Sequence, residues 1–339
     1  MPDAPVPTLA VERLSIEVAN RTGTTRLVDD VSFTISPGRT LCVVGESGCG
    51  KSITSLAVMG LLATPPLRVS TGRVLFEGQD LLTLDARARA DLRGDRMTMI
   101  FQEPMTSLNP AFTIGDQIAE VVARHRDVSS DKARAVALEM LKRVRIPSAE
   151  KRLDEYPHQM SGGMRQRVMI AMALANGPRL LIADEPTTAL DVTIQAQILS
   201  LVRSLQRETG TAMLLITHDL GVVAEVADDV AVMYAGRIVE RGPVHAVFED
   251  PQHPYTIGLM GSLPSLSGGE GRLATIRGSV PPPDRMPAGC RFAPRCPFAV
   301  EACTRAQPPL VSVSEGHDVA CIRAPLEQHV DPVREGVAA

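Results

Sequence analysis

The stretch from Leu41 to Leu62 constrains the fold most, because it combines an apolar run, a glycine-rich turn and a helical run. The apolar run Leu41–Val44 predicts a buried strand. The turn reads GESGCGKS and fits the pattern G-x-x-x-x-G-K-[ST]. The run Ile53–Leu62 predicts a helix that ends before the Pro65-Pro66 pair. This order of strand, turn and helix predicts a phosphate-binding loop in an α/β fold.

The residue types in this loop are those that the phosphates of a nucleotide require. Its glycines can adopt positive φ and let backbone N–H groups approach an anion closely. The first N–H groups of the following helix and the helix dipole favour the same anion. We expect Lys51 to reach the β- and γ-phosphates and the Ser52 hydroxyl to bind Mg²⁺. The residues expected to contact the nucleotide here are Gly45, Glu46, Ser47, Gly48, Cys49, Gly50, Lys51 and Ser52.

Length and composition exclude several classes of protein. The 339 residues suffice for one large domain or two, with an ample core. The net charge of −4 argues against a broad nucleic-acid-binding surface. No apolar run reaches the roughly 18 residues that span a bilayer, and the first ten residues lack the pattern of a signal peptide. We therefore expect a cytosolic chain whose membrane role, if it has one, requires partner subunits.

Short apolar runs along the chain predict further strands around this loop. Residues 9–44 alternate short apolar runs with turns and predict a small β-rich layer. Residues 105–160 show apolar positions at helical spacing and predict a helical insertion. Residues 192–206 predict an amphipathic helix and residues 230–241 a hairpin. From about residue 261 the composition shifts to Pro, Gly, Arg and Cys, which predicts a domain boundary near residue 260.

Polar side chains follow three of the predicted strands at their carboxyl ends. Gln102 follows the run 97–101, Asp184-Glu185 follows the run 180–183, and His218 comes soon after the run 212–216. Ligands of open parallel sheets gather at the carboxyl ends of the strands, so these side chains are expected to meet Lys51 in one site.

The acidic pair and its neighbours have the chemistry of nucleotide hydrolysis. Asp184 can hold Mg²⁺, and Glu185 can polarise a water molecule against the γ-phosphate. Gln102 can bind Mg²⁺ or the attacking water, and His218 can donate a hydrogen bond to the γ-phosphate. The predicted catalytic residues are thus Glu185, Gln102 and His218. The alternatives are a helix cap for the acidic pair and structural roles for Gln102 and His218.

A second anion site is predicted at Ser161-Gly162-Gly163, which follows the helical insertion and precedes a helix. The two glycines expose backbone N–H groups at that helix start. Two anion sites so far apart in sequence suggest a nucleotide held between two chains. The alternative is an ordinary capped turn.

Taken in order, these motifs resemble those of ATP-binding cassette (ABC) ATPases. The resemblance is carried over residues 9–260 by GESGCGKS, Gln102, SGGMRQR, LLIADEP, TALD and His218. Longer phrases such as FQEPMTSLNP and ADEPTTALDVTIQAQIL resemble the oligopeptide/dipeptide/nickel importer subgroup. The segment PAGCRFAPRCPFAVEAC resembles the C-terminal extension of its peptide-importing members and carries the likeness to about residue 325.

The resemblance implies a fold and a division of the chain. The fold is α/β: a P-loop NTPase nucleotide-binding domain with a parallel-sheet core, an antiparallel β layer and a helical subdomain at about residues 103–165. This domain would span residues 1–260. A small Pro- and Cys-rich C-terminal domain would span residues 261–325, and residues 326–339 would form a disordered tail.

The resemblance also implies a mechanism and partners. Two cassettes would dimerise head to tail, with Ser161, Gly162 and Gly163 of one chain meeting the ATP held by Lys51 of the other. Asp191 would cross the interface, and Gln102 would sense the γ-phosphate. The implied partners are a second and paralogous ATPase subunit, two transmembrane permease subunits and an extracytoplasmic substrate-binding protein, but no nucleic acid. The chain would lie at the cytoplasmic face of the membrane.

The implied function is ATP-driven import of oligopeptides or dipeptides. Nickel, glutathione or an oligosaccharide are alternative substrates, and a metal-sensing regulatory ATPase is an alternative of another class. One position departs from the family pattern: the place of the adenine-stacking aromatic, near Val18, carries no aromatic residue, and Phe33 is the first. Adenine would then pack on Val18 or a neighbour.

Four of the six cysteines cluster near the C-terminus. Cys290, Cys296, Cys303 and Cys321 have the spacings C-x5-C, C-x6-C and C-x17-C, which are neither those of common zinc sites nor the bacterial ferredoxin run. A proline follows Cys296, and Arg291, Arg295 and Arg305 could offset the negative charge of a cluster. We favour a [4Fe–4S] cluster, with structural zinc and free or disulfide-bonded thiols as the alternatives. Cys42 and Cys49 are expected to be packing residues.

Overall fold

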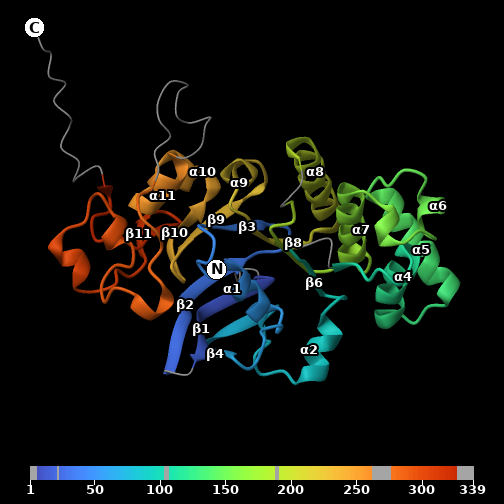
Figure 1. Cartoon of the computed structure of the whole chain (residues 1–339), viewed down its shortest axis with the longest axis horizontal. Coiled ribbons are helices and arrows are strands. Elements are labelled where there is room, and N and C mark those ends of the chain that lie inside the picture. The colour runs from blue at the N-terminus through green and yellow to red at the C-terminus, as the bar shows by residue number, and fades with distance from the viewer. Residues whose placement is uncertain (1–5, 21–22, 103–106, 188–190, 262–275, 327–339) are drawn as a thin grey trace, which may run out of the picture.

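The computed structural model describes residues 6–20, 23–102, 107–187, 191–261 and 276–326, with the side chain of residue 192 left out. Two sheets, a group of helices and a C-terminal segment make up the molecule (Figure 1). The helices between residues 114 and 174 lie at one end of its long axis, and the segment after residue 276 lies at the other.

The smaller sheet is antiparallel and is formed mainly by the N-terminal part of the chain. Its order is β2-β1-β4-β5. Its strands are β1 (Leu9–Asn20), β2 (Gly23–Ile35), β4 (Leu67–Phe76) and β5 (Gln79–Asp80). This sheet confirms the β-rich layer that the alternating apolar runs predict.

The larger sheet has the order β11-β12-β10-β9-β3-β8-β7-β6. Strands β9, β3, β8, β7 and β6 run parallel, and β10, β12 and β11 continue the sheet in antiparallel pairs. Its strands are β3 (Thr40–Val44), β6 (Met97–Ile100), β7 (Leu180–Asp184), β8 (Ala212–Ile216), β9 (Asp229–Tyr234), β10 (Arg237–Pro243), β11 (Val311–Ser314) and β12 (His317–Val319). The parallel-sheet core is therefore confirmed.

Alternate side chains of the parallel strands enter two different hydrophobic cores. In β3, Cys42 and Val44 face the core that also contains side chains of the helical region, whereas Leu41 and Val43 face the core shared with β1 and β2. Both faces of the sheet are thus covered, which explains why these strands are continuously apolar.

The helices begin where polar side chains cap them. Thr113, Ser129 and Ser161 each accept a hydrogen bond from a backbone N–H in the first turn of the helix that follows. The helical insertion is confirmed.

The helices are α1 (Lys51–Val58), α2 (Ala86–Leu92), α4 (Ile114–His125), α5 (Ser130–Arg143), α6 (Ala149–Arg152), α7 (Gly162–Leu174), α8 (Val192–Thr209), α9 (Leu220–Val226), α10 (Val244–Glu249) and α11 (Pro254–Met260). Four short 3₁₀ helices are η1 (Pro157–Gln159), η2 (Pro283–Arg285), η3 (Ala293–Arg295) and η4 (Glu301–Thr304).

The predicted end of the first helix was wrong. Helix α1 ends at Val58, and Gly60 takes a φ of 65°. The N–H of Gly60 bonds the carbonyl of Ala57, and that of Leu61 bonds the carbonyl of Leu56. This pair of bonds is the Schellman motif, which the left-handed glycine permits. A glycine, rather than the proline pair, ends the helix.

The C-terminal segment joins the larger sheet. Strand β12 pairs with β10, so the edge of that sheet comes from residues beyond the proposed boundary. The division near residue 260 remains a prediction. The predicted tail, apart from Leu326, lies outside the described residues, as do residues 103–106 of the predicted helical subdomain and residues 188–190 of the TALD motif.

A buried carboxylate ties this segment to the cassette. Glu240 on β10 has no exposed surface and accepts hydrogen bonds from the N–H groups of Gln252 (2.7 Å) and His253 (2.9 Å). The ring of His317 on β12 lies 2.8 Å from the same carboxylate. His253 is also buried, and its Nδ1 accepts the N–H of Tyr255 at 3.1 Å, which caps α11.

We expect stability to fall as the pH is lowered from about 6.5 toward 4, because burial lowers the pKa of His253 to about 4. The unfolded chain binds the proton near pH 6.5 and the folded chain does not, so acid favours unfolding. The expected contribution is roughly 2 kcal/mol between pH 7 and about 4.5. It is measured as the difference in urea-unfolding free energy between wild type and His253→Asn.

The asparagine variant is the matched control, since its side-chain oxygen can still cap α11 but does not titrate in this range. The contribution of the carboxylates to the pH dependence is expected in both proteins, so it cancels when their free energies of unfolding are subtracted. Equal pH dependence in the two proteins would contradict the assignment to His253.

Candidate nucleotide site

The glycine-rich loop has the backbone shape that the sequence predicts. Gly45, Gly48 and Gly50 take φ values of 151°, 77° and 106°. A Cβ added to Gly45 would lie 2.1 Å from the carbonyl oxygen of Met233, so no larger residue fits there. The loop therefore packs its backbone against β9 and turns directly into α1.

Lys51 is buried beneath this loop, with 5% of its surface exposed. Its Nζ donates hydrogen bonds to the carbonyl oxygens of Gly45 (2.8 Å) and Glu46 (3.0 Å). Cys49 is buried in the core, and its Sγ lies 3.7 Å from Nζ. Cys49 thus contributes backbone to the loop and its side chain to packing. Cys42, buried in β3, packs in the same way.

The hydroxyl and the first carboxylate expected to hold Mg²⁺ lie together. Ser52 Oγ donates to Asp184 Oδ1 at 3.1 Å, across 132 residues of sequence. Burial raises the pKa of Asp184 above its ordinary value, and the charge of Glu185 adds to this rise. A bound divalent cation would favour the ionised carboxylate.

Glu185 lies between the other two predicted catalytic side chains. Gln102 Nε2 donates to Glu185 Oε2 at 3.1 Å, and His218 Nδ1 lies 3.4 Å from Oε1. The backbone of Glu185 has a φ of 46°, in the left-handed region that non-glycine residues rarely adopt. Such strain is concentrated at functional positions. The carboxyl ends of β3, β6, β7 and β8 therefore bring these side chains to one place, as the parallel arrangement predicts.

The second predicted anion site lies at the start of α7. Ser161 caps α7, accepting the N–H of Met164 at 3.4 Å, and a Cβ added to Gly162 would meet only open space. Asp191 caps α8 by accepting the N–H of Ile194 at 2.9 Å. Ser161 and Asp191 are exposed. Ser161 therefore forms the capped turn that was the alternative to an anion site, and Asp191 is likewise a helix cap within one chain.

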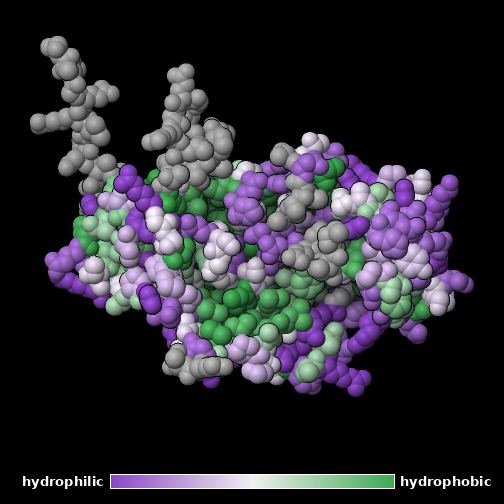
Figure 2. Space-filling model, viewed as in Figure 1, coloured by the Kyte–Doolittle hydropathy of each residue, from purple (hydrophilic) through white to green (hydrophobic). Residues whose placement is uncertain are grey.

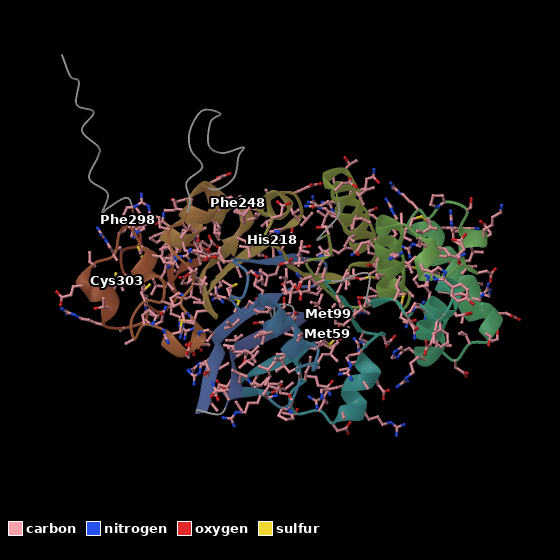
Figure 3. The ribbon with its side chains drawn as sticks, in the orientation of Figure 1. Met59, Met99, His218, Phe248, Phe298 and Cys303 are labelled. Carbon is pink, nitrogen blue, oxygen red and sulfur yellow. The ribbon has the colours of Figure 1, made fainter. Side chains whose placement is uncertain are left out.

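The four C-terminal cysteines converge on one small cavity. Cys290, Cys296, Cys303 and Cys321 line it together with His253 and Phe298, and its volume is about 20 Å³. Figure 3 places Cys303 and Phe298 in the C-terminal segment, far from His218. Burial raises the pKa of Cys296 to about 11, and the charges of the other three thiols add to this rise. Within the described ranges, no three His, Cys, Asp or Glu side chains are arranged to hold a single metal ion.

Two arginines near these cysteines pair with carboxylates of the cassette. Arg291 Nη2 lies 2.5 Å from Asp29 Oδ2, and Arg295 forms two bonds with the Glu46 carboxylate. The charges of Arg291 and Arg295 are thus paired with Asp29 and Glu46 of the cassette, which lie against the C-terminal segment.

The sequence motifs gave no sign of the contacts that Glu46 makes. The N–H of Glu46 donates to the hydroxyl of Tyr255 on α11 at 2.8 Å. Neither Tyr255 nor Arg295 carries a local sequence signal that would reveal a contact more than 200 residues away.

An apolar groove lies beside the site. It has a volume of about 290 Å³ and is lined mainly by Met59, Leu61, Met99, Phe101, Met169 and Met172. Figure 2 shows hydrophobic surface in the middle of this face, where Figure 3 places Met59 and Met99. Phe101 and Leu61 remain 42% and 37% exposed, and Phe101 directly precedes Gln102.

Comparison with known proteins identifies the family. The model for the ABC transporter family matches residues 28–188, and that for the oligopeptide/dipeptide transporter C-terminal region matches residues 239–303. A peptide import ATP-binding protein of Brucella abortus (strain 2308) is 53% identical over 94% of this chain and 97% of its own length. One of Brucella ovis is 55% identical over 87% of this chain and 91% of its own length.

Solved structures share the fold. The dimeric structure of MJ0796, described as a bacterial ABC transporter cassette, has a TM-score of 0.63 and 26% identity, covering 70% of this chain and 98% of that one. A post-hydrolysis state of MJ0796 bound to ADP and Pi matches equally well. This chain therefore belongs to the ABC transporter ATPases, in the group that carries the oligopeptide/dipeptide transporter C-terminal region.

Proposed function

We propose that this chain is the ATP-hydrolysing subunit of an importer of oligopeptides or dipeptides. The observation that carries the proposal is the identity of 50–55% to peptide import ATP-binding proteins, which extends over the cassette and the C-terminal region together. Nickel, glutathione and oligosaccharide are competing substrates, and a metal-sensing regulatory ATPase is the competing function of another class.

The site supports an assignment of roles within one cassette. Lys51 and the loop would hold the phosphates of ATP. Ser52, Asp184 and Gln102 offer the hydroxyl, carboxylate and amide oxygens that Mg²⁺ prefers. Glu185 would take the proton of the attacking water, with Gln102 and His218 orienting its carboxylate. When bound, Mg²⁺ would neutralise charge on the phosphates.

Two cassettes would complete each site. Ser161, Gly162 and Asp191 are exposed, so a second chain could reach them. The dimeric arrangement of the MJ0796 cassette supports this geometry. We propose that the second chain is a paralogous ATPase subunit.

The apolar groove supports docking of a permease subunit. Phe101 lines the groove and directly precedes Gln102 in the chain. A movement of Gln102 on nucleotide binding would therefore reach an apolar helix bound in the groove. In the described part of the chain, no helix is long and apolar enough to cross a membrane. We propose that two permease subunits hold the chain at the cytoplasmic face of the membrane and receive peptide from an extracytoplasmic binding protein.

We further propose that Cys290, Cys296, Cys303 and Cys321 hold a [4Fe–4S] cluster. Four thiols lining one cavity are the donor set that such a cluster would take. The cavity of about 20 Å³ holds about one water molecule, so the side chains would rotate outward to admit the cluster.

Uptake by the complete transporter tests the main proposal. The chain is assembled with its permease, binding-protein and second ATPase subunits in vesicles, and labelled di- and oligopeptides, nickel, glutathione and an oligosaccharide are compared. We expect ATP-dependent accumulation of peptide, and its loss with Glu185→Gln in this chain. Accumulation of another solute without peptide would overturn the peptide assignment.

A further inference from the structure

The C-terminal segment contacts the phosphate loop directly. Arg295 Nη1 donates to Glu46 Oε2 at 2.6 Å, and Arg295 Nη2 donates to Glu46 Oε1 at 2.9 Å. Glu46 is the second residue of GESGCGKS, and the two partners are 249 residues apart in sequence. Two parallel bonds between a guanidinium and a carboxylate form the most directional ion pair available to side chains.

Arg295 is held rigidly where it makes this contact. Only 4% of its side chain is exposed, and Nη2 also donates to the carbonyl oxygen of Gly278 at 3.2 Å. The guanidinium lies over the rings of Tyr234 and Phe292, 5.7 and 6.0 Å from their centroids. These contacts hold the guanidinium from several sides, so it constrains the position of the Glu46 carboxylate.

Glu46 connects this arginine to the residue that is expected to bind the phosphates. Its carboxylate bonds Arg295, its N–H bonds the hydroxyl of Tyr255, and its carbonyl oxygen accepts from Lys51 Nζ at 3.0 Å. Three anchors on one residue define the path of the loop between β3 and α1. Loss of the carboxylate anchor would leave more loop conformations for ATP to order on binding.

The arginine that holds the Glu46 carboxylate belongs to the stretch from Cys290 to Cys296. Arg295 directly precedes Cys296, and Arg291 directly follows Cys290. Arg291 reaches Asp29 on β2, while Arg295 reaches the loop. The two arginines therefore connect the turn that lines the cysteine cavity to two separate parts of the cassette.

We propose that Arg295 is a positioning residue for the phosphate loop: acting through Glu46, it makes the affinity for ATP depend on the C-terminal segment. The proposal rests on the proposed binding of ATP at this loop and is independent of the transported solute. Arg295 raises ATP affinity, whereas turnover at saturating ATP depends on Glu185, which is held by other partners.

A double-mutant cycle on the full-length chain tests this. Equilibrium binding of a fluorescent ATP analogue is measured for wild type, Arg295→Gln, Glu46→Gln and the double variant. We expect R295Q to raise the Kd roughly tenfold and to have almost no further effect when Glu46→Gln is present. In the assembled transporter, R295Q is expected to raise the KM for ATP similarly and leave kcat within about twofold.

The matched control is Arg305→Gln, which removes an exposed arginine of the same segment that pairs with Glu301. It should leave the Kd unchanged. An R295Q effect of equal size with and without Glu46 would mean that Arg295 acts only through packing, and an unchanged Kd in R295Q would also overturn the inference. Failure of the wild-type chain to bind ATP would instead overturn the proposed function.

Discussion

Glu185→Gln is expected to lower ATP turnover at least about 100-fold while ATP still binds. The substitution keeps the size and shape of the side chain, and its amide oxygen can still accept the bond from Gln102. The amide cannot take a proton from water, so the loss falls on the chemical step. Phosphate release at saturating Mg-ATP measures turnover, and binding of a fluorescent analogue measures affinity.

The same change at Glu249 is the control, since that residue is exposed at the end of α10. Glu249→Gln should leave turnover unchanged. Undiminished hydrolysis in Glu185→Gln would show that another group accepts the proton. His218, 3.4 Å from the Glu185 carboxylate, would then be the first residue to test.

The convergence of the nucleotide site was predictable from sequence. Each side chain in it follows an apolar strand, and parallel strands place their carboxyl ends at one edge of the sheet. Ser52 and Asp184, or Gln102 and Glu185, therefore meet across long sequence separations without any pairwise signal. The rule is geometric, so it needs only the strand order and the position of each polar residue.

Contacts between the C-terminal segment and the cassette were not predictable in this way. The pairing of Arg295 with Glu46 and of β12 with β10 joins segments that share no periodic pattern. A charged residue on a Pro-rich stretch has many possible partners, and only the packed fold selects one. The sequence suggested only that arginines near the cysteines could offset the charge of a cluster, and it gave no sign that Asp29 and Glu46 of the cassette bind two of them.

The end of α1 was also not predictable from the sequence pattern, although the residues involved are neighbours in the chain. A proline pair is a reliable helix breaker, but it sets only the latest possible end. Gly60 stops the helix earlier through the Schellman bonds, whose formation depends on the left-handed backbone of one glycine. The roles of Ser161 and Asp191 across a dimer stay predictions, because within one chain both residues act as helix caps.

Cys303→Ala is expected to abolish iron binding by the chain. Anaerobically purified wild type should contain about four irons and four sulfides, with absorbance near 400 nm. Cys303 is the most buried of the four cysteines that line the cavity, so its loss removes one ligand where no exposed side chain can replace it. Metal and sulfide analysis of the variant measures the effect.

Cys42→Ala is the matched control, because it removes a buried thiol from β3 instead of the C-terminal segment. It should retain the full iron content. If the wild type holds one zinc and no iron, the site is a structural zinc site. If it holds no metal at all, the four thiols serve only in packing. Burial raises the pKa of Cys290, Cys296 and Cys321, so these thiols hold protons that a bound metal must displace.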